Sequence, residues 1–395
     1  MLILVINSGS SSIKYQVRTA DPAGEQSPPA SAAQHTGQEP VLAKGLIENI
    51  GEPTGPKDHS AALDQMAQEI DAALDGREID AVGHRVVHGG EQFSAPAIVD
   101  DQTICEIERL APLAPLHNPA NALGIRAIQK KWPTLPQVVV FDTAFHRTMP
   151  EKAWRYALPE EFYRQQGIRR YGFHGTSHDY VTAQAAEFLG LPREEFDGVI
   201  AHLGNGASVT AIRGGLSVDT SMGYTPLAGL MMGTRSGDVD PSVLTSILLR
   251  TPDLDAERLD AILNKESGLK AIGGTNDMRA LVELAEGGDD AAALAMEMAA
   301  YRLAKYIGGY HVAVGGAKTL VFTAGIGENS APFRKLVVDQ LGALGVTLDE
   351  EANRVRAEGI RVISGPDSRL SILVVPTDEE RAIAEATAEL VSTRR

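Results

Sequence analysis

The sequence predicts an α/β protein built from two related domains, each with helices packed on a β-sheet. The N-terminus gives the first observation, because an apolar run at residues 2–6 is followed by a small-residue turn at 7–12 and a second strand at 13–17. A similar arrangement recurs at residues 199–212, where Gly204-Asn205-Gly206 separates two further strands. This recurrence indicates that one strand–turn–strand unit has been duplicated.

Helices and strands alternate after the first hairpin. Strands are expected at residues 41–47, 81–87 and 137–141, with a helix at about 119–131 before the last of them. A helix between the first two strands carries an apolar face made of Leu63, Met66, Ile70, Ala73 and Leu74. Such βαβ order predicts a mostly parallel sheet with helices on it.

The second half of the chain repeats this order. A third apolar strand at residues 319–323 runs into the glycine-rich segment 324–329, after a long helix expected at 290–314. A strand at 371–375 precedes a C-terminal helix that begins near residue 379, with Asp378 or Thr377 as its N-cap. In this interpretation Glu379 is a favourable acidic residue of the first helical turn.

Composition limits the class of protein. The 395 residues are 43% apolar and 22% charged, which suits two globular domains. The net charge of −16 argues against nonspecific binding to nucleic acid or to an anionic membrane. One cysteine, Cys105, excludes an internal disulfide and fits a reducing compartment, and no apolar run has membrane-spanning length. We therefore expect a cytoplasmic protein, with a loop of no assigned role at residues 19–40.

The N-terminal turn has the composition of an anion site. Backbone N–H groups and serine hydroxyls in a tight turn can converge on an anion, and Lys14 adds a positive charge. The alternative is that this turn only closes a hairpin. No GxxxxGK[ST] motif occurs, and no GxGxxG motif precedes a distant acidic residue, which argues against P-loop and dinucleotide-binding proteins.

Two pairs of histidines have the four-residue spacing of some metal sites, namely His84/His88 and His174/His178. The first pair lies in a strand, where residues four apart are about 13 Å from each other. The second lies in His-Gly-Thr-Ser-His, which lacks the glutamate of HExxH and suits the start of a helix. With no third ligand nearby in the sequence, these histidines do not predict a zinc site.

Three charged residues are candidates for a functional site. Arg85 interrupts an apolar strand, and Arg235 lies in a glycine-rich loop, so each could bind a carboxylate or phosphate with two hydrogen bonds. A structural ion pair is the alternative for either residue. Asp142 follows the strand at 137–141, at the carboxyl end where α/β sheets place their active sites.

Taken together, the motifs resemble those of the acetate kinase family, within the sugar-kinase/Hsp70/actin superfamily. They cover the whole chain in order and read NSGSSSIKY at Asn7, GHRVVHGGE at Gly83, LAPLHNPAN at residues 113 to 121 with the preceding RLAP, FDTAFH at Phe141, YGFHGTSH at Tyr171, HLGNGAS at His202, DTSMGYTPLAGLMMGTRSGDVDP at Asp219, FTAGIGENS at Phe322 and PTDEE at Pro376. The last motif has Asp378 where the family pattern has asparagine.

The resemblance implies two actin-like, ribonuclease H-like domains with mixed sheets and an active site in the cleft between them. The first domain would comprise residues 1–147 and 379–395, and the second residues 148–378. The implied reaction is reversible phosphoryl transfer between ATP and acetate with Mg²⁺, or alternatively Mn²⁺. The resemblance also implies a homodimer.

The resemblance further implies a role for each matching residue. The catalytic residues would be Arg85, Asp142, His174 and Arg235, and Asn7 and Glu379 would position the metal. An apolar pocket for the methyl group of acetate would be formed, beside Arg85, by Val87, Leu116, Phe173 and Pro226. The nucleotide would contact Lys14, His202, Leu203, Gly204, Asn205, Gly206, Asp277, Met278, Arg279, Gly325, Ile326, Gly327, Glu328 and Asn329.

Two alternatives stay open at this point. A propionate or butyrate kinase would use the same chemistry with a deeper pocket. An ATP-driven binding protein related to Hsp70 or actin would share the nucleotide-binding architecture without transferring phosphate to a carboxylate. Because acetate titrates near pH 4.3, as a glutamate side chain does, it needs no general base at pH 7, so we expect Asp142 to orient Mg²⁺ or its waters.

Overall fold

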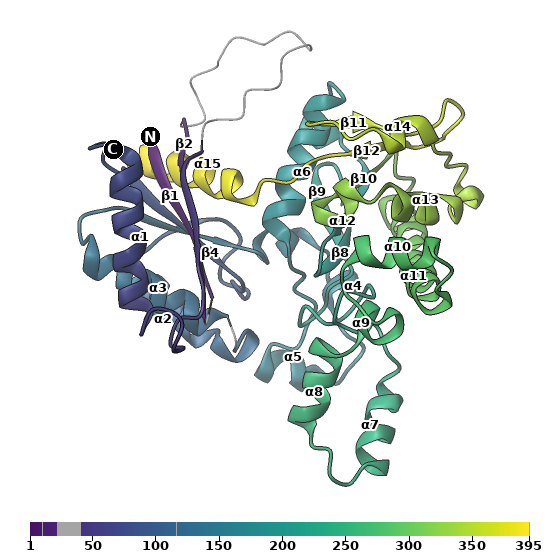
Figure 1. Cartoon of the computed structure of the whole chain (residues 1–395), viewed down its shortest axis with the longest axis horizontal. Helices are drawn as coiled ribbons and strands as arrows, with labels where there is room; N and C mark the ends of the chain where they lie inside the picture. Colours follow the sequence, from purple (N-terminus) through teal and green to yellow (C-terminus); the bar gives the residue numbers. More distant parts are fainter. Residues whose placement is uncertain (10, 22–40, 116, 395) are drawn as a thin grey trace. The chain divides into compact units, whose positions relative to one another are not determined.

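The computed structural model describes residues 1–9, 11–21, 41–115 and 117–394. Leu116 and residues 22–40 of the long loop lie outside the described residues. The chain forms two compact units (Figure 1). The first contains Met1–Arg147, Gly175–Ser177 and Asp378–Arg395, and the second contains Thr148–His174 and His178–Thr377. We propose that these units are the two domains.

A mixed sheet of six strands forms the centre of the first unit. Its order is β3-β2-β1-β4-β6-β5, with bounds β1 (Leu2–Ser8), β2 (Ile13–Thr19), β3 (Val41–Ile47), β4 (Ala81–Val86), β5 (Ala97–Ile98) and β6 (Gln137–Phe141). The first three strands are antiparallel neighbours, whereas β1, β4 and β6 run parallel. In register, Ile6 pairs with His84, which pairs with Val139.

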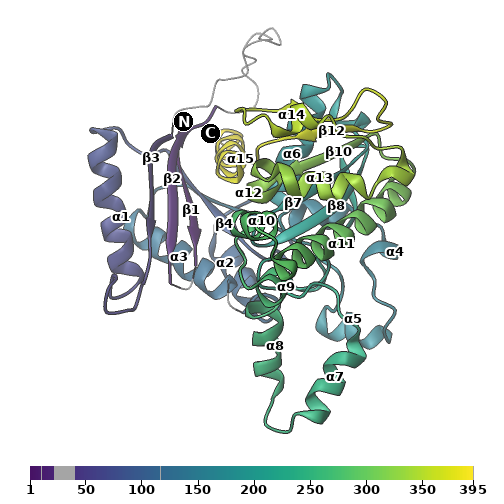
Figure 2. The ribbon, with the colours of Figure 1, turned by 45° about the vertical axis from the view of Figure 1, so that its right-hand side comes forward.

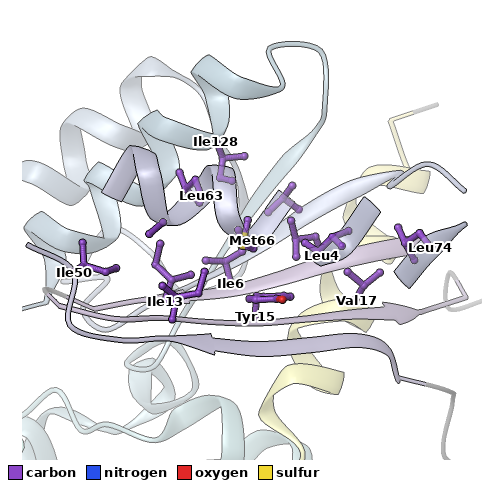
Figure 3. Packing of buried hydrophobic residues seen from close by; sticks show 14 residues of the cluster. Leu4, Ile6, Ile13, Tyr15, Val17, Ile50, Leu63, Met66, Leu74 and Ile128 are labelled. Carbon is purple, nitrogen blue, oxygen red and sulfur yellow. The ribbon is translucent and has the colours of Figure 1, made fainter. Parts of the chain in front are cut away.

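Helices cover both faces of this sheet. The helices are α1 (His59–Leu74), α2 (Asp101–Arg109), α3 (Asn118–Lys131) and the C-terminal α15 (Glu379–Ser392), with a 3₁₀ turn at Ala111–Leu113. Alternate residues of a strand point to opposite faces. Leu4 and Ile6 therefore pack with Met66 of α1 (Figure 3), while Ile3 packs with Ile383 of α15. Figure 2 shows α1 and α15 on opposite sides of β1 and β2.

Two sequence expectations need correction here. Ala73, expected in the apolar face of α1, is exposed, because Met66, Ile70 and Leu74 form the buried row at spacings of four residues. The expected strand at 81–87 ends one residue earlier, at Val86. Asp378, rather than Thr377, caps α15, and its side chain accepts the backbone N–H of Arg381.

The second unit repeats the topology of the first. Its sheet has the order β11-β12-β10-β7-β8-β9, with bounds β7 (Gly198–Leu203), β8 (Ala207–Arg213), β9 (Leu216–Thr220), β10 (Thr319–Thr323), β11 (Arg361–Val362) and β12 (Ser371–Val374). Strands β7, β8 and β9 are antiparallel neighbours and β7, β10 and β12 run parallel. The duplication is therefore confirmed, but each sheet is mixed rather than mostly parallel.

Helices of the second unit connect these strands. They are α4 (Glu151–Trp154), α5 (Glu160–Gln166), α6 (Gly175–Phe188, whose first three residues belong to the first unit), α7 (Pro241–Arg250), α8 (Ala256–Lys265), α9 (Gly268–Gly273), α10 (Met278–Glu286), α11 (Asp290–Val314), α12 (Ala324–Asn329), α13 (Ala331–Asp339) and α14 (Glu350–Arg354), with 3₁₀ turns at Arg193–Glu195 and Gly342–Leu344. A further 3₁₀ turn, Ala144–Thr148, ends the first unit and begins the second. The long α11 has the predicted bounds and packs on β7 and β8. Across the described ranges, no helix has the length and apolar character needed to cross a membrane.

Candidate active site

The carboxyl ends of parallel strands bring charged side chains together in the first unit. Arg85 lies near the end of β4, and Asp142 directly follows the neighbouring β6. The Arg85 guanidinium makes two hydrogen bonds to the Asp142 carboxylate, from Nη2 to Oδ2 at 2.5 Å and from Nε to Oδ1 at 3.1 Å. Asp142 is 1% exposed, so this is a largely desolvated ion pair.

The two predicted metal-positioning residues lie around the same guanidinium. Arg85 Nη1 is 3.5 Å from Oδ1 of Asn7, near the end of β1, and Arg85 Nε is 3.8 Å from Oε2 of Glu379, the first residue of α15. The structure thus brings Asn7, Arg85, Asp142 and Glu379 together. Three of these residues lie at the ends of strands and the fourth begins a helix. In the sequence they are spread from near the N-terminus to near the C-terminus.

The electrostatics of this cluster favour additional positive charge. Burial raises the pKa of Asp142; Arg85 opposes this effect and Glu379 adds to it. Burial likewise raises the pKa of Glu379, with Arg85 opposing and Glu380 adding. Since burial is the main cause of both shifts, a cation bound beside these groups would favour their ionised forms.

Two further ion pairs fix the start of α15. Arg18 on β2 makes two hydrogen bonds to Asp378, at 2.6 and 2.7 Å. Lys14, predicted to contact the nucleotide, is paired with Glu380 in this structure. Because Glu379 lies between these two anchored residues, its backbone is fixed relative to β2.

The N-terminal turn is closed by its own backbone and by α1. The N–H of Gly9 donates to the carbonyl of Ser12 at 2.8 Å, and His59 Nε2 donates to the carbonyl of Gly9 at 3.0 Å. That this turn binds an anion stays a prediction.

Sequence reasoning missed two buried asparagines. Asn121 Nδ2 donates to the Ser8 carbonyl at 2.7 Å, and its Oδ1 accepts the N–H of Val87 at 3.2 Å. Asn118 makes the same kind of two-way contact with the backbone of His88. Asn121 thereby joins the segments that follow Asn7 and Arg85. The sequence signal for them was the presence of two asparagines on an otherwise apolar face of α3. A buried amide without hydrogen-bond partners costs free energy, so such residues indicate partners nearby.

A second group of residues surrounds His174 in the second unit. His174 precedes α6 with φ of 57°, a left-handed conformation that is unfavourable for a residue with a Cβ. Its Nδ1 lies 3.0 Å from Oγ of Ser208, and its ring stacks on His202 at 4.2 Å between centroids. His178 contacts the same hydroxyl, at 2.8 Å. The His-Gly-Thr-Ser-His segment thus starts a helix, as predicted.

Arg235 lies close to His174. A Cβ built on Gly206 would lie 3.4 Å from Arg235 Nη1 and 3.5 Å from His174 Nε2. The Arg235 guanidinium donates to the Pro226 carbonyl at 3.3 Å, and among the described residues it forms no ion pair with a carboxylate. Burial lowers its pKa. Unlike Arg85, this partly buried cation is available to bind an anion.

Four of the predicted nucleotide contacts line one pocket of the second unit. Leu203 ends β7 and Gly204 follows it in the turn to β8, while Met278 comes from the start of α10 and Ile326 from α12. The remaining lining is mainly apolar, including Leu230, Leu269 and Phe333. The structure thus brings these four residues together beside a glycine turn, and nucleotide binding by them stays a prediction.

Other predicted nucleotide contacts have structural partners. Asp277 caps α10 and pairs with Arg279 at 2.9 Å. Asn205 Oδ1 accepts from Asn276, and its carbonyl accepts from Gly233.

In the 324–329 segment, Glu328 Oε1 accepts the N–H of Thr377, and Asn329 donates to the Gly325 carbonyl. Gly327 lies in the short helix α12, which begins at Ala324 with a left-handed φ of 64°. Ligand contacts by these residues stay predictions.

The predicted methyl pocket is divided between the units. Val87 is buried in the first, whereas Phe173 is buried and Pro226 half-buried in the second. Leu116 lies outside the described residues. No cluster of three histidine, cysteine or carboxylate side chains suited to a metal occurs in the described part of the chain.

Fold and site together define an α/β protein of two units with the same strand topology, with charged residues at the strand ends of one unit and a small cavity beside a glycine turn in the other. The chain matches the Acetokinase family over residues 2–385. It therefore belongs to the acetokinase family, as its motifs predicted.

Known relatives cover the chain from end to end. It is 64% identical to an acetate kinase of Kocuria rhizophila, with 99% of this chain and 98% of the relative covered, and 63% identical to one of Arthrobacter sp., with 99% of each covered. The crystal structure of Porphyromonas gingivalis acetate kinase matches with a TM-score of 0.89 at 42% identity, covering 99% of each chain. A propionate kinase from Francisella tularensis matches with a TM-score of 0.87 at 39% identity, covering 98% of each.

Proposed function

We propose that this chain is an acetate kinase that transfers the terminal phosphoryl group of ATP reversibly to acetate. The observation that carries this proposal is full-length identity of 60–64% to four relatives, each named acetate kinase. The two arginines, the glycine-turn pocket and His174 supply the groups that such a transfer requires. A cytoplasmic location stays a prediction.

The chemistry follows from charge. An acetate oxygen attacks the terminal phosphorus while the bond to the bridging oxygen of ADP breaks, and acetate is already ionised at neutral pH. Two anions must therefore approach each other, so alignment and charge neutralisation account for most of the catalysis. Arg85 and Arg235 would bind the carboxylate and the transferred group, and His174 Nε2 would contact the equatorial oxygens.

The residues around Arg85 fit a hard divalent cation. Asn7, Asp142 and Glu379 present an amide oxygen and two carboxylates, the donor types that Mg²⁺ prefers, and a bound cation would oppose the effect of burial, which raises the pKa of both carboxyls. Glu379 and Asn7 would position the ion, which when bound would neutralise phosphate charge. Mn²⁺ would suit the same oxygens.

Asp142 has a second role in this proposal. Its two hydrogen bonds to Arg85 fix the plane of the guanidinium that would bind substrate. We therefore expect Asp142→Asn to alter both the Mg²⁺ dependence and the KM for acetate. An unchanged Mg²⁺ dependence with a shifted pH–rate profile would instead support a proton-transfer role.

A hydroxamate assay tests the proposed reaction. Acetyl phosphate should form from ATP and acetate when Mg²⁺ is present, and it should not form without acetate. Failure to form it would reject the acetate kinase proposal.

Preference for propionate is a second candidate, favoured by the close structural match to a propionate kinase. One methylene in an apolar pocket changes discrimination by only about 1–3 kcal/mol, so propionate should be a measurable substrate. Side-by-side kcat/KM values for acetate, propionate and butyrate decide between the two.

A homodimer also stays a proposal. Helix α11 exposes a row of apolar side chains, Leu294, Met298, Tyr301 and Val312, between 39% and 76% exposed. Light scattering during size-exclusion chromatography tests the dimer, and Leu294→Lys with Met298→Lys tests this surface.

A further inference from the structure

The ring of His174 contacts a hydroxyl group that a second histidine also contacts. Ser208 Oγ lies 3.0 Å from Nδ1 of His174 and 2.8 Å from Nε2 of His178. His178 lies one helical turn after His174, and its N–H donates to the His174 carbonyl at 2.9 Å. Ser208 and His178 are 0% exposed, so bulk water does not compete for these contacts.

The other ring nitrogen of His174 has a different environment. The position of a Cβ on Gly206 is 3.5 Å from His174 Nε2 and 3.4 Å from Nη1 of Arg235. His202 stacks on the ring with an interplanar angle of 22°, which restricts its rotation. Nδ1 therefore points to the buried hydroxyl, and Nε2 lies on the side of Arg235.

We propose that Ser208 and His178 are positioning residues that fix the tautomer of His174 with its proton on Nε2. A neutral imidazole carries one N–H, and a hydroxyl can donate one hydrogen bond while accepting another. In the arrangement we propose, His178 Nε2–H donates to Ser208 Oγ, and the Ser208 O–H donates to His174 Nδ1. Each contact then has one donor and one acceptor.

This direction of the hydrogen bonds matters for phosphoryl transfer, and the inference rests here on the proposed function. A neutral His174 with its proton on Nε2 presents a donor to a phosphoryl oxygen. The opposite direction, with Ser208 donating to His178, leaves a lone pair on His174 Nε2 that would repel the same oxygen. The direction of the hydrogen bond from Ser208 thus decides whether His174 presents an N–H or a lone pair at Nε2.

Nitrogen NMR of the full chain, labelled with ¹⁵N-histidine, tests the tautomer without substrate. At pH 8, with His174→Gln identifying the signals, we expect a protonated Nε2 and an unprotonated Nδ1 in the wild type. Ser208→Ala should convert His174 to a mixture of tautomers. A proton on Nδ1 in the wild type, or a His174 spectrum that Ser208→Ala leaves unchanged, would overturn the proposal.

Kinetics provide the second readout. Ser208→Ala should lower kcat by about 10- to 100-fold, while the KM for ATP changes by less than about threefold, because alignment rather than binding is lost. Ser208→Thr, which keeps the hydroxyl, should recover most of kcat.

Thr210→Val is the matched control for these kinetics. Thr210 lies two residues further along β8, is equally buried and pairs with the Thr220 hydroxyl at 2.9 Å. The Thr210→Val variant should keep the wild-type kcat. Equal losses of kcat in Ser208→Ala and Thr210→Val would count against a specific role of Ser208. If Ser208→Ala does not fold, the wild-type spectrum still decides. A wild type that makes no acetyl phosphate would reject the proposed function, whereas the tautomer would still be decided by NMR.

Discussion

Arg18 and Asp378, 360 residues apart in the sequence, form a two-hydrogen-bond ion pair at 2.6 and 2.7 Å. The same carboxylate accepts the N–H of Arg381 at 3.0 Å and so caps α15. One side chain therefore both starts the C-terminal helix and ties it to β2. The position of Glu379, the next residue, depends on this pair.

Replacing Arg18 should reduce both stability and activity. Arg18→Gln removes hydrogen bonds to a charged partner, which should lower the free energy of unfolding by about 1.5–3 kcal/mol. Arg109→Gln is the control, because Arg109 forms an exposed pair with Glu106 that should contribute less than about 1 kcal/mol. Urea unfolding measures both, and equal small losses would show that the Arg18 pair does not anchor α15.

Replacing Arg85 and replacing Arg235, the two arginines proposed to bind substrate, should change stability by different amounts, although we expect both changes to slow catalysis. Arg85→Ala leaves Asp142 as a buried, unpaired carboxylate, which should cost about 3–5 kcal/mol of folding stability. Arg235→Ala breaks no ion pair among the described residues and should cost about 1 kcal/mol or less.

Each of these variants should lose about 10²–10³ in kcat/KM for acetate. Arg213→Ala, at the exposed end of β8, is the control and should be as active as the wild type. Full activity of Arg235→Ala would exclude this residue from the reaction.

His84 should make the protein less stable in mild acid. Burial lowers its pKa to about 4, despite a 2.8 Å hydrogen bond to Gln137. Between pH 6.5 and 4 the unfolded chain therefore binds a proton that the folded protein does not. As the pH is lowered through this range, this residue should reduce the free energy of unfolding by up to about 1.4 kcal/mol per pH unit.

The variant His84→Gln isolates this effect. It cannot titrate, so its unfolding free energy should fall less steeply than that of the wild type between pH 6.5 and 4.5. His88, whose pKa burial lowers to about 3, is present in both proteins and cancels in the comparison. Parallel curves from urea unfolding at several pH values would contradict a neutral, buried His84.

Gly233 should not tolerate a side chain. A Cβ there would lie 2.0 Å from Oδ1 and 3.2 Å from the carbonyl oxygen of Asn205, in the turn beside the predicted nucleotide pocket. Gly233→Ala should cost about 1–3 kcal/mol and raise the KM for ATP. Gly342→Ala, where nothing lies within 4 Å, should change neither, and a harmless Gly233→Ala would show that this turn is free to move.

Local sequence signals predicted much of the fold. The bounds of α11, β3 and β6 agree with those expected, because apolar periodicity and end residues are local properties. In α11, for example, Asp289 caps the start and Gly315, with φ of 89°, ends the helix. The duplicated topology was also readable, since each copy begins with a strand–turn–strand unit.

Contacts between distant segments were not predictable in this way. Motifs placed Arg85 and Asp142 in the site, but their mutual ion pair depends on the register of β4 and β6. Asn121 and Ser208 were missed because their importance comes from partners far away in sequence. The hydrogen bond from the Thr377 N–H to the Glu328 carboxylate likewise joins residues 49 apart, while the nucleotide contact expected of Glu328 stays a prediction.

Phosphorus NMR with ¹⁸O-labelled acetate, ATP and Mg²⁺ tests the central claim directly. Direct attack by acetate predicts ADP and acetyl phosphate whose phosphorus is bonded to one ¹⁸O, seen as an isotope shift. Inorganic phosphate without acetyl phosphate would instead identify an ATPase. AMP and pyrophosphate would place the attack at the wrong phosphorus, and either result would contradict the proposed function.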